Sequence, residues 1–375
     1  MTVFDEHRGY LRDTHRLAAY ARAIDATVRV GDVVIDLGAG TGILGLMACR
    51  AGARRVYAID DGSVLAVARA MSASNELEMR ITHLKSHSTR AELPERADVV
   101  LADQMGPMGI EAGLLECFAD ARARLLTPSG RCVPSALDVI VAPVDARAPG
   151  LEPLPTSAGF DASVMEQWAA SEVRAIALDA RDVIGAPSLG RRFVLGEPYA
   201  AHSQLSAELV IDRAGRLGGV AAWFDAELAP GISVTNSPFV AERIDRKNAL
   251  FPLSPPIDVS RDDRVEVTID VRPRDDVSRW QVRVTTAAGV VTKRDRSTLD
   301  GPLFSLDDLR RTHPKRTPRR GPEADARLLV LTLCDGTHAL DEIERDLQAR
   351  HASLFRSRAE AAAFVAKIVE RDLES

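Results

Sequence analysis

The sequence predicts an α/β domain with a parallel sheet, then an antiparallel β-barrel or sandwich, then a small helical, winged-helix-like module. Three observations predict this order. Residues 33–60 have the pattern strand, glycine-rich turn, helix, strand; residues 135–300 contain short alternating strands between turns rich in Pro and Gly; helical periodicity follows residue 323. The expected boundaries are 1–134, 135–300, 301–322 for a basic linker, and 323–375.

The first domain is organised around residues 33–60, VVIDLGAGTGILGLMACRAGARRVYAID. An apolar, β-rich run is followed at once by Gly38, Gly40 and Gly42, where the backbone must approach a ligand closely or adopt a positive φ. A helix and a second strand, which ends at Asp60, complete the unit. A glycine loop between strand and helix, with an acidic residue about 20 positions on, is the signature of a bound nucleoside.

Two details of the loop point away from NAD and from triphosphates. The pattern is D-L-G-x-G-T-G, with Asp36 inside the strand end, and no Lys follows the glycines. The loop resembles motif I of class I S-adenosylmethionine (SAM) methyltransferases, which have a Rossmann-like fold; a bare βαβ unit with a tight turn is the alternative. The resemblance implies SAM as cofactor, with a binding set of Asp36, Gly38, Gly40, Thr41, Gly42 and, for the ribose hydroxyls, Asp60.

Composition excludes several classes of protein. A net charge of −6 argues against a general nucleic-acid coat or a membrane-surface protein, and no apolar run approaches the length of a membrane span. With 46% hydrophobic but only 5% aromatic residues, aliphatic packing must dominate the core. Four scattered cysteines without C-x-x-C spacing predict reduced thiols in a cytoplasmic protein, and no metal site is expected.

The segment ahead of the glycine loop, residues 1–30, predicts an amphipathic helix. Protein arginine methyltransferases have H-x-x-M-L-x-D-x-x-R-x-x-x-Y there, and this sequence resembles that pattern at His7, Tyr10, Leu11, Asp13, Arg16 and Tyr20. The resemblance implies that Arg16 pairs with the SAM carboxylate and that His7 supports it, although Tyr10 stands where Met is usual. It also places His87 and Ser88 beside the adenine; a solvated loop is the alternative for both.

A second motif, residues 102–116, directly follows a predicted strand. The arginine methyltransferases have S-E-W-M-G and then a second Glu, a hairpin whose carboxylates clamp the guanidinium; here Asp103, Met105, Gly106 and Glu111 match. Asp replaces Glu, Gln104 replaces Trp, and the loop is one residue shorter. The alternative is a polar strand end followed by a helix N-terminal Glu.

Carboxylates suit methyl transfer to nitrogen. The reaction is an in-line displacement that needs a neutral amine held at near-attack distance, and an amine is mostly protonated at neutral pH. A carboxylate can take the proton or stabilise charge that develops on nitrogen, so Asp103 and Glu111 are the catalytic candidates. A thiol or phenol acceptor would require a His or Lys base, and the hairpin has neither.

The resemblance to arginine methyltransferases extends through residues 135–300. After S-P-F the family has a T-H-W stretch that lines the arginine pocket, and this sequence has Ile244, Asp245 and Arg246 there. An arginine in an ordinary protein is therefore a doubtful substrate, and a smaller or differently shaped amine fits better, contacted by Met105 and Asp245. The family often dimerises through an arm near residues 145–165, which leaves a homodimer open.

The last 50 residues predict helices at 323–333, 340–347 and 359–373, the second capped by Thr337 or Asp341. LLVLTLCDGTHALDEI and FVAKIVER resemble PqqD-like recognition elements, which bind the leader of a ribosomally made peptide as an added strand. Residues 302–306 could supply a strand. A structural cap or a dimerisation module is the alternative.

Three functions remain open from the sequence. The leading hypothesis is a SAM-dependent N-methyltransferase acting on an amine of a precursor peptide, and daptide-type and related peptide-modifying methyltransferases are a candidate family. The second is an N-methyltransferase of free arginine or another small amino or guanidino compound. The third is an inactive SAM-binding scaffold that recruits a peptide. A precursor peptide is the expected partner.

Overall fold

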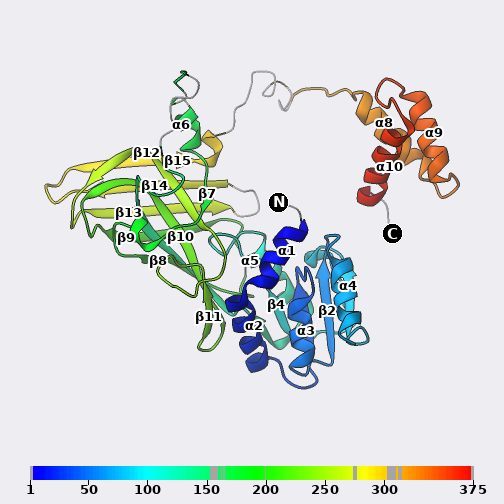
Figure 1. The fold of residues 1–375 in the computed structure, drawn as a ribbon, viewed down its shortest axis with the longest axis horizontal. Helices are drawn as coiled ribbons and strands as arrows, with labels where there is room; N and C mark the ends of the chain where they lie inside the picture. Colours follow the sequence, from blue (N-terminus) through cyan, green and yellow to red (C-terminus); the bar gives the residue numbers. More distant parts are fainter. Residues whose placement is uncertain are drawn as a thin grey trace. The chain divides into compact units, whose positions relative to one another are not determined.

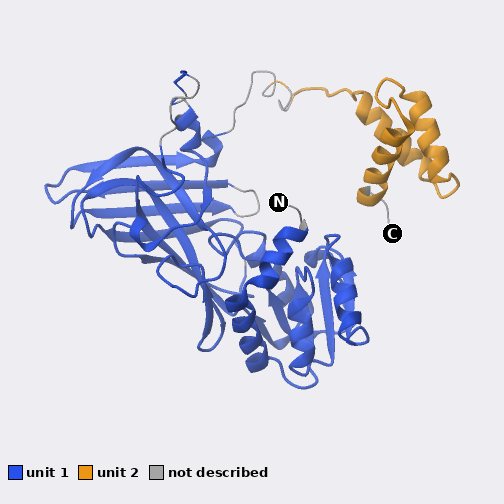
Figure 2. Ribbon diagram, viewed as in Figure 1, with its two compact units in different colours: residues 1–302 blue, residues 303–375 orange. Residues whose placement is uncertain are grey.

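A computed structural model describes residues 3–152, 159–161, 163, 165–198, 200–272, 277–301, 310 and 315–372. The chain divides into two compact units, Met1–Pro302 and Leu303–Ser375 (Figure 2). The two N-terminal domains expected from the sequence both lie within the first unit. The strand considered at residues 302–306 and part of the expected dimerisation arm, residues 153–158, lie outside the described residues.

The first unit begins with a parallel sheet in the order β3-β2-β1-β4-β5 (Figure 1). Its strands are β1 (Val33–Leu37), β2 (Arg55–Asp60), β3 (Ile81–Lys85), β4 (Ala97–Ala102) and β5 (Leu126–Val133). Every described neighbour pair is parallel, and the strand order reverses between β1 and β4. An open α/β sheet binds its ligand outside the carboxyl ends of the strands at such a switch point. The residues after β1 and β4 are therefore the place to look for a site.

The helices of this domain are α1 (Val3–Arg12), α2 (Thr14–Thr27), α3 (Ile43–Arg50), α4 (Leu65–Ser74) and α5 (Leu114–Asp120). The prediction of a single N-terminal helix is wrong, because the structure has two helices, α1 and α2, separated at Asp13. The Asp13 side chain accepts the backbone N–H of Arg16 at 3.0 Å and caps α2. The buried face of α2 includes Arg16 and Tyr20, two residues that the amphipathic pattern placed at polar and boundary positions.

Two antiparallel sheets follow, as the sequence predicted. A six-stranded sheet has the order β7-β12-β10-β6-β8 with β11 beside β10, and a four-stranded sheet has the order β15-β14-β13-β9. Their strands are β6 (Ala136–Asp145), β7 (Arg174–Ile176), β8 (Ser188–Val194), β9 (Ser203–Val210), β10 (Gly215–Ala229), β11 (Ile232–Thr235), β12 (Asn248–Val259), β13 (Arg264–Arg272), β14 (Val277–Thr285) and β15 (Val291–Ser297). The helical pieces between elements are α6 (Met165–Ala169), η1 (Ser88–Arg90), η2 (Ala121–Leu125), η3 (Ala180–Asp182) and η5 (Thr298–Asp300).

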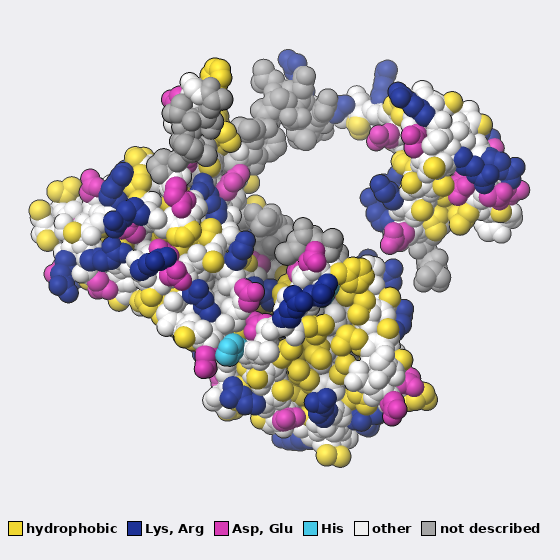
Figure 3. All heavy atoms as spheres, in the orientation of Figure 1, with side chains coloured by type: hydrophobic (Ala, Val, Ile, Leu, Met, Phe, Trp, Pro, Cys, Tyr) yellow, Lys and Arg dark blue, Asp and Glu magenta, His cyan; other side chains and the backbone are white. Residues whose placement is uncertain are grey.

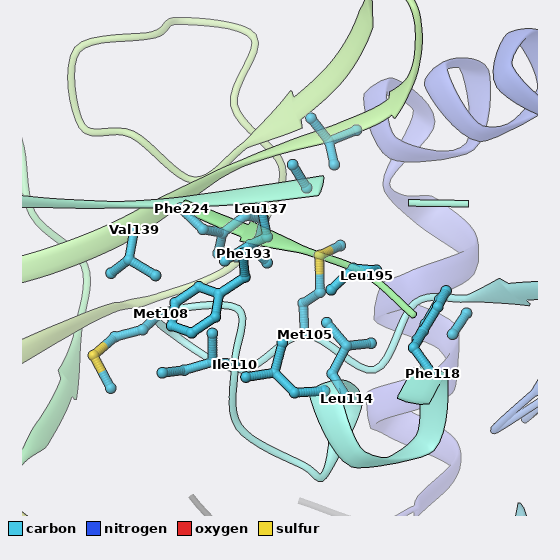
Figure 4. Packing of buried hydrophobic residues seen from close by; sticks show 14 of the residues in the cluster. Met105, Met108, Ile110, Leu114, Phe118, Leu137, Val139, Phe193, Leu195 and Phe224 are labelled. Carbon is cyan, nitrogen blue, oxygen red and sulfur yellow. The ribbon is translucent and has the colours of Figure 1, made fainter. Parts of the chain in front are cut away.

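One hydrophobic core joins the parallel sheet to the barrel. The segment after β4 carries Met105, Met108 and Ile110 into this core, where Figure 4 shows them among Leu137, Phe193 and Phe224 of the barrel strands. Gly109 has a φ of +85°, and a Cβ there would overlap the Leu137 side chain, so only glycine allows this close approach. The segment that carries the predicted catalytic carboxylates is thus anchored in the barrel.

The second unit contains α8 (Pro322–Leu333), α9 (Leu340–Arg350) and α10 (Arg358–Asp372), close to the predicted ranges. Their buried side chains form a separate core: Ala326, Val330, Ile343, Leu347, Phe355, Ala361, Val365 and Ile368. The predicted cap of α9 by Thr337 or Asp341 is wrong. The Glu342 carboxylate instead accepts the backbone N–H of Ala339 at 3.0 Å. Ala339 is the N-cap residue, and a Glu three positions after the N-cap can reach back to that donor.

No helix in the described part of the chain is long and apolar enough to cross a membrane. The four cysteines are free thiols, and three of them are buried. On the face drawn in Figure 3, acidic and basic side chains are interspersed.

Candidate active site

A cavity of about 500 Å³ lies at the carboxyl edge of the parallel sheet, beside the ends of the neighbouring strands β1 and β4, between which the strand order reverses. Its walls come from α1, the start of α2, the loops after β1 and β2, the segment after β4, and one residue of the barrel. The polar side chains that line it are Glu6, His7, Tyr10, Arg16, Asp36, Thr41, Asp60, Ser63, Asp103, Gln104 and Arg246. Nine of the fourteen site residues predicted from the sequence line this cavity. The five that do not are Gly42, His87, Ser88, Glu111 and Asp245.

The glycine loop forms the floor of the cavity. Gly38, Gly40 and Gly42 have φ values of +61°, +53° and +77°, a region that other residues rarely adopt. A Cβ on Gly38 would overlap the Gln104 side chain, and one on Gly40 would lie 3.0 Å from the His7 ring. The loop therefore needs glycine both for its conformation and for the closeness of the side chains above it.

Asp60 joins the end of β2 to the glycine loop. One carboxylate oxygen accepts the Gly40 N–H at 2.8 Å and the other accepts the Gly62 N–H at 2.7 Å. These bonds fix the carboxylate at the cavity wall. Its remaining lone pairs can accept hydrogen bonds from two neighbouring hydroxyls.

Asp36, at the end of β1, is almost completely buried and accepts the Gly45 N–H at 2.9 Å. Burial raises the pKa of this carboxyl group to about 7, and the Gly45 bond opposes the shift. The group faces the cavity, so a cationic ligand there would favour its ionised form.

Arg16 forms a buried ion pair with Asp103, and its Nη2 donates to the Tyr10 carbonyl at 2.8 Å. Desolvation lowers the pKa of this guanidinium. Its Nε is buried and has no hydrogen-bond partner among the described residues. The Tyr20 hydroxyl donates to the Ala102 carbonyl at 2.9 Å and lies 3.3 Å from the second Asp103 oxygen. Asp103 is thus held at the end of β4 by two residues of α2.

Glu111 lies on the same hairpin as Asp103 but faces a different space. Its carboxylate oxygens accept the Met108 N–H at 3.0 and 3.2 Å, which closes the hairpin, and burial raises its pKa. The group lies directly against Gly106, where a Cβ would come within 2.7 Å of it. It lines a second cavity of about 400 Å³ at the barrel end, together with Met108 and Ile110. The hairpin backbone therefore separates the two carboxylates that the sequence predicted as a clamp.

The barrel contributes Arg246 to the first cavity. Its Nη1 donates to the Tyr10 hydroxyl at 3.2 Å, and its Cζ lies 5.0 Å from the centre of the Tyr10 ring. Asp245, which the sequence predicted as a substrate contact, lies outside this cavity: its backbone N–H donates to Asp13 at 2.9 Å, and the residue is exposed. Of these two adjacent residues, only Arg246 lines the first cavity.

Of four other predicted site residues, two line the cavity and two do not. His7 and Met105 line the cavity, and Met105 is only 2% exposed. His87 and Ser88 do not line it. His87 is exposed with its ring 2.8 Å from the Thr89 hydroxyl, and Ser88 donates to Cys117 at 3.1 Å.

Asn236 was missed by the sequence analysis. It is fully buried, and its amide donates to the carbonyls of Pro107 at 2.9 Å and Lys247 at 2.8 Å, while its carbonyl accepts the Phe224 N–H at 2.9 Å. One side chain therefore connects the carboxylate hairpin, the barrel strand β10 and the loop that carries Arg246. Nothing in the local sequence indicates this role, because its partners lie up to 129 residues away.

The chain is similar to several known methyltransferases. The family model of ribosomal protein L11 methyltransferase (PrmA) matches residues 14–137. Protein arginine N-methyltransferase 6 of Danio rerio is 28% identical over 323 residues, which cover 80% of this chain and 90% of that protein. Probable histone-arginine methyltransferase 1.3 of Arabidopsis thaliana is 37% identical over 136 residues, 36% of this chain and 25% of that protein.

Two solved structures share the fold at 20% identity, each covering 78% of this chain and 97% of its own. Arabidopsis thaliana protein arginine methyltransferase 10, in an open conformation, has a TM-score of 0.66. The Trypanosoma brucei PRMT1 enzyme-prozyme heterotetrameric complex with AdoHcy has a TM-score of 0.69.

Fold, cavity and relatives together define a SAM-dependent methyltransferase. Its architecture is that of the arginine methyltransferase structures, a Rossmann-like domain followed by an antiparallel barrel, and its cofactor is S-adenosylmethionine. The residues present fit that cofactor. The glycine floor admits a close ligand, Asp60 suits a ribose diol, and the buried unpaired Nε of Arg16 suits a carboxylate.

Proposed function

We propose that this enzyme methylates the nitrogen of an amine, and that the acceptor meets the cofactor at the hairpin after β4. The observation that carries the proposal is the position of Asp103, which lines the cofactor cavity at the switch point of the sheet. Glu111 supports it from the other side of the same hairpin. These carboxylates are the groups on this hairpin that can accept a proton from an amine.

The cofactor supplies a methyl group made electrophilic by a sulfonium. The chain has three tasks around it. Asp60 and Arg16 orient the bound molecule, and Tyr10 and His7 on α1 cover the cavity from the solvent side. Asp103 holds the acceptor nitrogen and accepts its proton as the new bond forms, and Glu111, on the far side of the hairpin, contributes negative charge without contacting the nitrogen.

Two features favour an amine over the guanidinium of a protein arginine. Asp103 is paired with Arg16, so it offers fewer free lone pairs than a carboxylate clamp needs. Arg246 adds a positive charge to the cavity, which disfavours a permanently cationic guanidinium more than an amine that can lose its proton. The relatives are arginine methyltransferases, and this supports a second candidate, methylation of arginine or of a small guanidino compound.

We further propose that the acceptor belongs to a ribosomally made precursor peptide whose leader binds the C-terminal unit. The separate hydrophobic core of that unit supports independent folding. Leu328, Leu331 and Leu340 are exposed on α8 and α9, which offers apolar surface for a peptide. A homodimer and a cytoplasmic location remain part of this proposal.

The test combines binding and turnover. Synthetic leader peptides encoded beside the gene are titrated into the full chain, and SAM-dependent methylation of each core peptide is followed by mass spectrometry. The same assays use a chain that ends at residue 302, with thermal unfolding as the check that it is folded. A peptide-tailoring enzyme binds one leader and loses turnover on truncation.

Two other outcomes have definite meanings. Turnover of free arginine or another small amine that survives truncation would support the second candidate and remove the peptide. A chain that binds SAM but yields no methylated product with any acceptor would point to an inactive scaffold.

A further inference from the structure

The barrel side of the active-site cavity contributes a cation at the place where the methyl acceptor must approach. Arg246 lines the same cavity as Asp103. Burial raises the pKa of Glu111, and the positive charge of Arg246 across the hairpin opposes part of that rise; the same charge contributes to the lowered pKa of Arg16, which is mainly due to desolvation. The guanidinium is therefore within electrostatic range of both catalytic carboxylates and of the residue assigned to the cofactor.

Arg246 has unused hydrogen-bonding capacity. A guanidinium carries five N–H donors, and the bond to the Tyr10 hydroxyl accounts for one of them. Within the described ranges, no carboxylate forms an ion pair with Arg246. Glu6 lines the same cavity, where it accepts a hydrogen bond from the Tyr10 hydroxyl at 2.5 Å. Stacking on Tyr10 stabilises the cation without neutralising it.

Two guanidinium groups lie near one aromatic ring. The Cζ atoms of Arg16 and Arg246 are 5.2 and 5.0 Å from the centre of Tyr10. Arg16 comes from α2 and has the buried, unpaired Nε that suits the carboxylate of the cofactor. Arg246 comes from the barrel, which leaves it for a different anion.

We propose that Arg246 binds a carboxylate carried by the methyl acceptor, close to the nitrogen that is methylated. The inference rests on the proposed N-methylation at this hairpin and adds the class of acceptor. A half-buried guanidinium with free donors prefers a planar carboxylate, to which it can form two parallel hydrogen bonds. An amino acid, or the last residue of a peptide with a free C-terminus, presents an amine and a carboxylate together.

The experiment uses matched ligands that differ in one carboxylate. Full-length protein saturated with S-adenosylhomocysteine is titrated calorimetrically with L-arginine against agmatine, L-ornithine against putrescine, and one peptide with a free C-terminus against its C-terminal amide. The first two pairs report a free amino acid and the third a peptide. Each titration is repeated with Arg246→Gln, which removes the charge, and with Lys247→Gln, which removes the charge of an exposed neighbour outside the cavity.

Wild type is expected to prefer the carboxylate member of at least one pair. R246Q should lose about tenfold or more of its affinity for that member, while its affinity for the analogue without the carboxylate does not fall. K247Q should behave as wild type. Three results would overturn the inference: no carboxylate preference in wild type, a preference that persists in R246Q, or loss of S-adenosylhomocysteine affinity in R246Q without a change in preference.

The proposed function is checked separately by transfer of a methyl group from SAM to the same ligands. If wild type prefers the carboxylate members but methylates no amine, the proposed function fails while the assignment of Arg246 as an anion-binding residue stands. If wild type methylates amines without any carboxylate preference, the proposed function stands and the assignment of Arg246 as an anion-binding residue fails.

Discussion

The cofactor half and the acceptor half of the cavity hold their charged groups in different ways. In the cofactor half, the carboxylates of Asp36 and Asp60 accept backbone N–H groups of their own βαβ unit, from residues 9 and 20 positions away. In the acceptor half, the contacts join distant parts of the chain. Tyr20 and Asp103 are 83 positions apart, and Tyr10 and Arg246 are 236.

This difference explains where the chain departs from the arginine methyltransferase pattern. The glycine loop depends on backbone conformations that residues other than glycine rarely adopt, and this chain has the complete motif. The acceptor half is built from side chains on separate elements, and each can change without disturbing the loop. The departures in the cavity, Tyr10, Asp103, Gln104 and Arg246, all come from elements other than the glycine loop. Cofactor chemistry is therefore fixed locally, and acceptor choice is set by long-range contacts.

The largest effect is expected from Asp103→Asn. Removing a base that contacts the acceptor should lower kcat by about 10² to 10⁴. The affinity for SAM should change much less than kcat, because the glycine loop and Asp60 are untouched and the amide oxygen of the new side chain can still accept a hydrogen bond from Arg16. Single-turnover methylation and calorimetry with SAM measure the two quantities. A kcat close to that of wild type would mean that Asp103 only positions Arg16.

The next effect tests the link between the two halves. Asn236→Ala leaves the Pro107 and Lys247 carbonyls and the Phe224 N–H without their partner in a buried site. The free energy of unfolding should fall by about 2–4 kcal/mol, measured by urea denaturation. Turnover should fall while SAM affinity is kept.

A matched variant for this comparison is Asn75→Ala. That amide caps an exposed helix end by donating to the Met71 carbonyl at 2.8 Å. The expected cost there is below about 1 kcal/mol. Equal costs at the two sites would contradict the role of Asn236 as a buried connector.

In the cofactor half, Asp60→Ala should weaken SAM binding by about tenfold to a hundredfold, since hydrogen bonds to a charged group are lost. The neighbouring Asp61→Ala, an exposed residue outside the cavity, is the control and should bind SAM like wild type. Calorimetric titration of each variant with SAM measures the two affinities. If both variants bind equally well, Asp60 does not contact the ribose.

The last prediction concerns the dependence of stability on pH. The pKa of Asp36 is raised to about 7 in the folded chain, above its unfolded value of about 3.9. Between these values the folded state holds a proton that the unfolded state has released. Stability from this group is therefore fully present below about pH 4 and is lost as the pH rises to about 7, by at most about 1.4 kcal/mol per pH unit.

Asp36→Asn keeps an oxygen for the Gly45 N–H but cannot titrate. The free energy of unfolding of wild type minus that of D36N should therefore fall as the pH rises from about 5 to about 7, in the absence of SAM. Urea denaturation of both proteins across this range measures it. A difference that is independent of pH would show that the Asp36 carboxyl is ionised throughout.

The sequence predicted the layered architecture and the glycine loop, because both follow from short-range pattern, and the resemblance of that loop to motif I of class I SAM methyltransferases predicted the cofactor. Strand, glycine turn and helix alternate within 28 residues, and β-barrel strands show their alternation directly. It failed at Asp13, where a side-chain cap broke the expected helix, and at the second C-terminal helix, where Glu342 replaced the expected cap. Both errors concern which of several nearby polar side chains reaches a free backbone group.

The sequence by itself determined that Asp103 and Glu111 lie on one hairpin at a strand end. Only the tertiary structure decided that they face two cavities, that Arg16 pairs with Asp103, and that Arg246 rather than Asp245 reaches the site. The physical reason is the distance along the sequence over which each feature is determined. Backbone conformation and hydrogen bonds within one supersecondary unit depend on neighbouring residues, whereas the direction and pairing of a side chain depend on which distant elements pack against it.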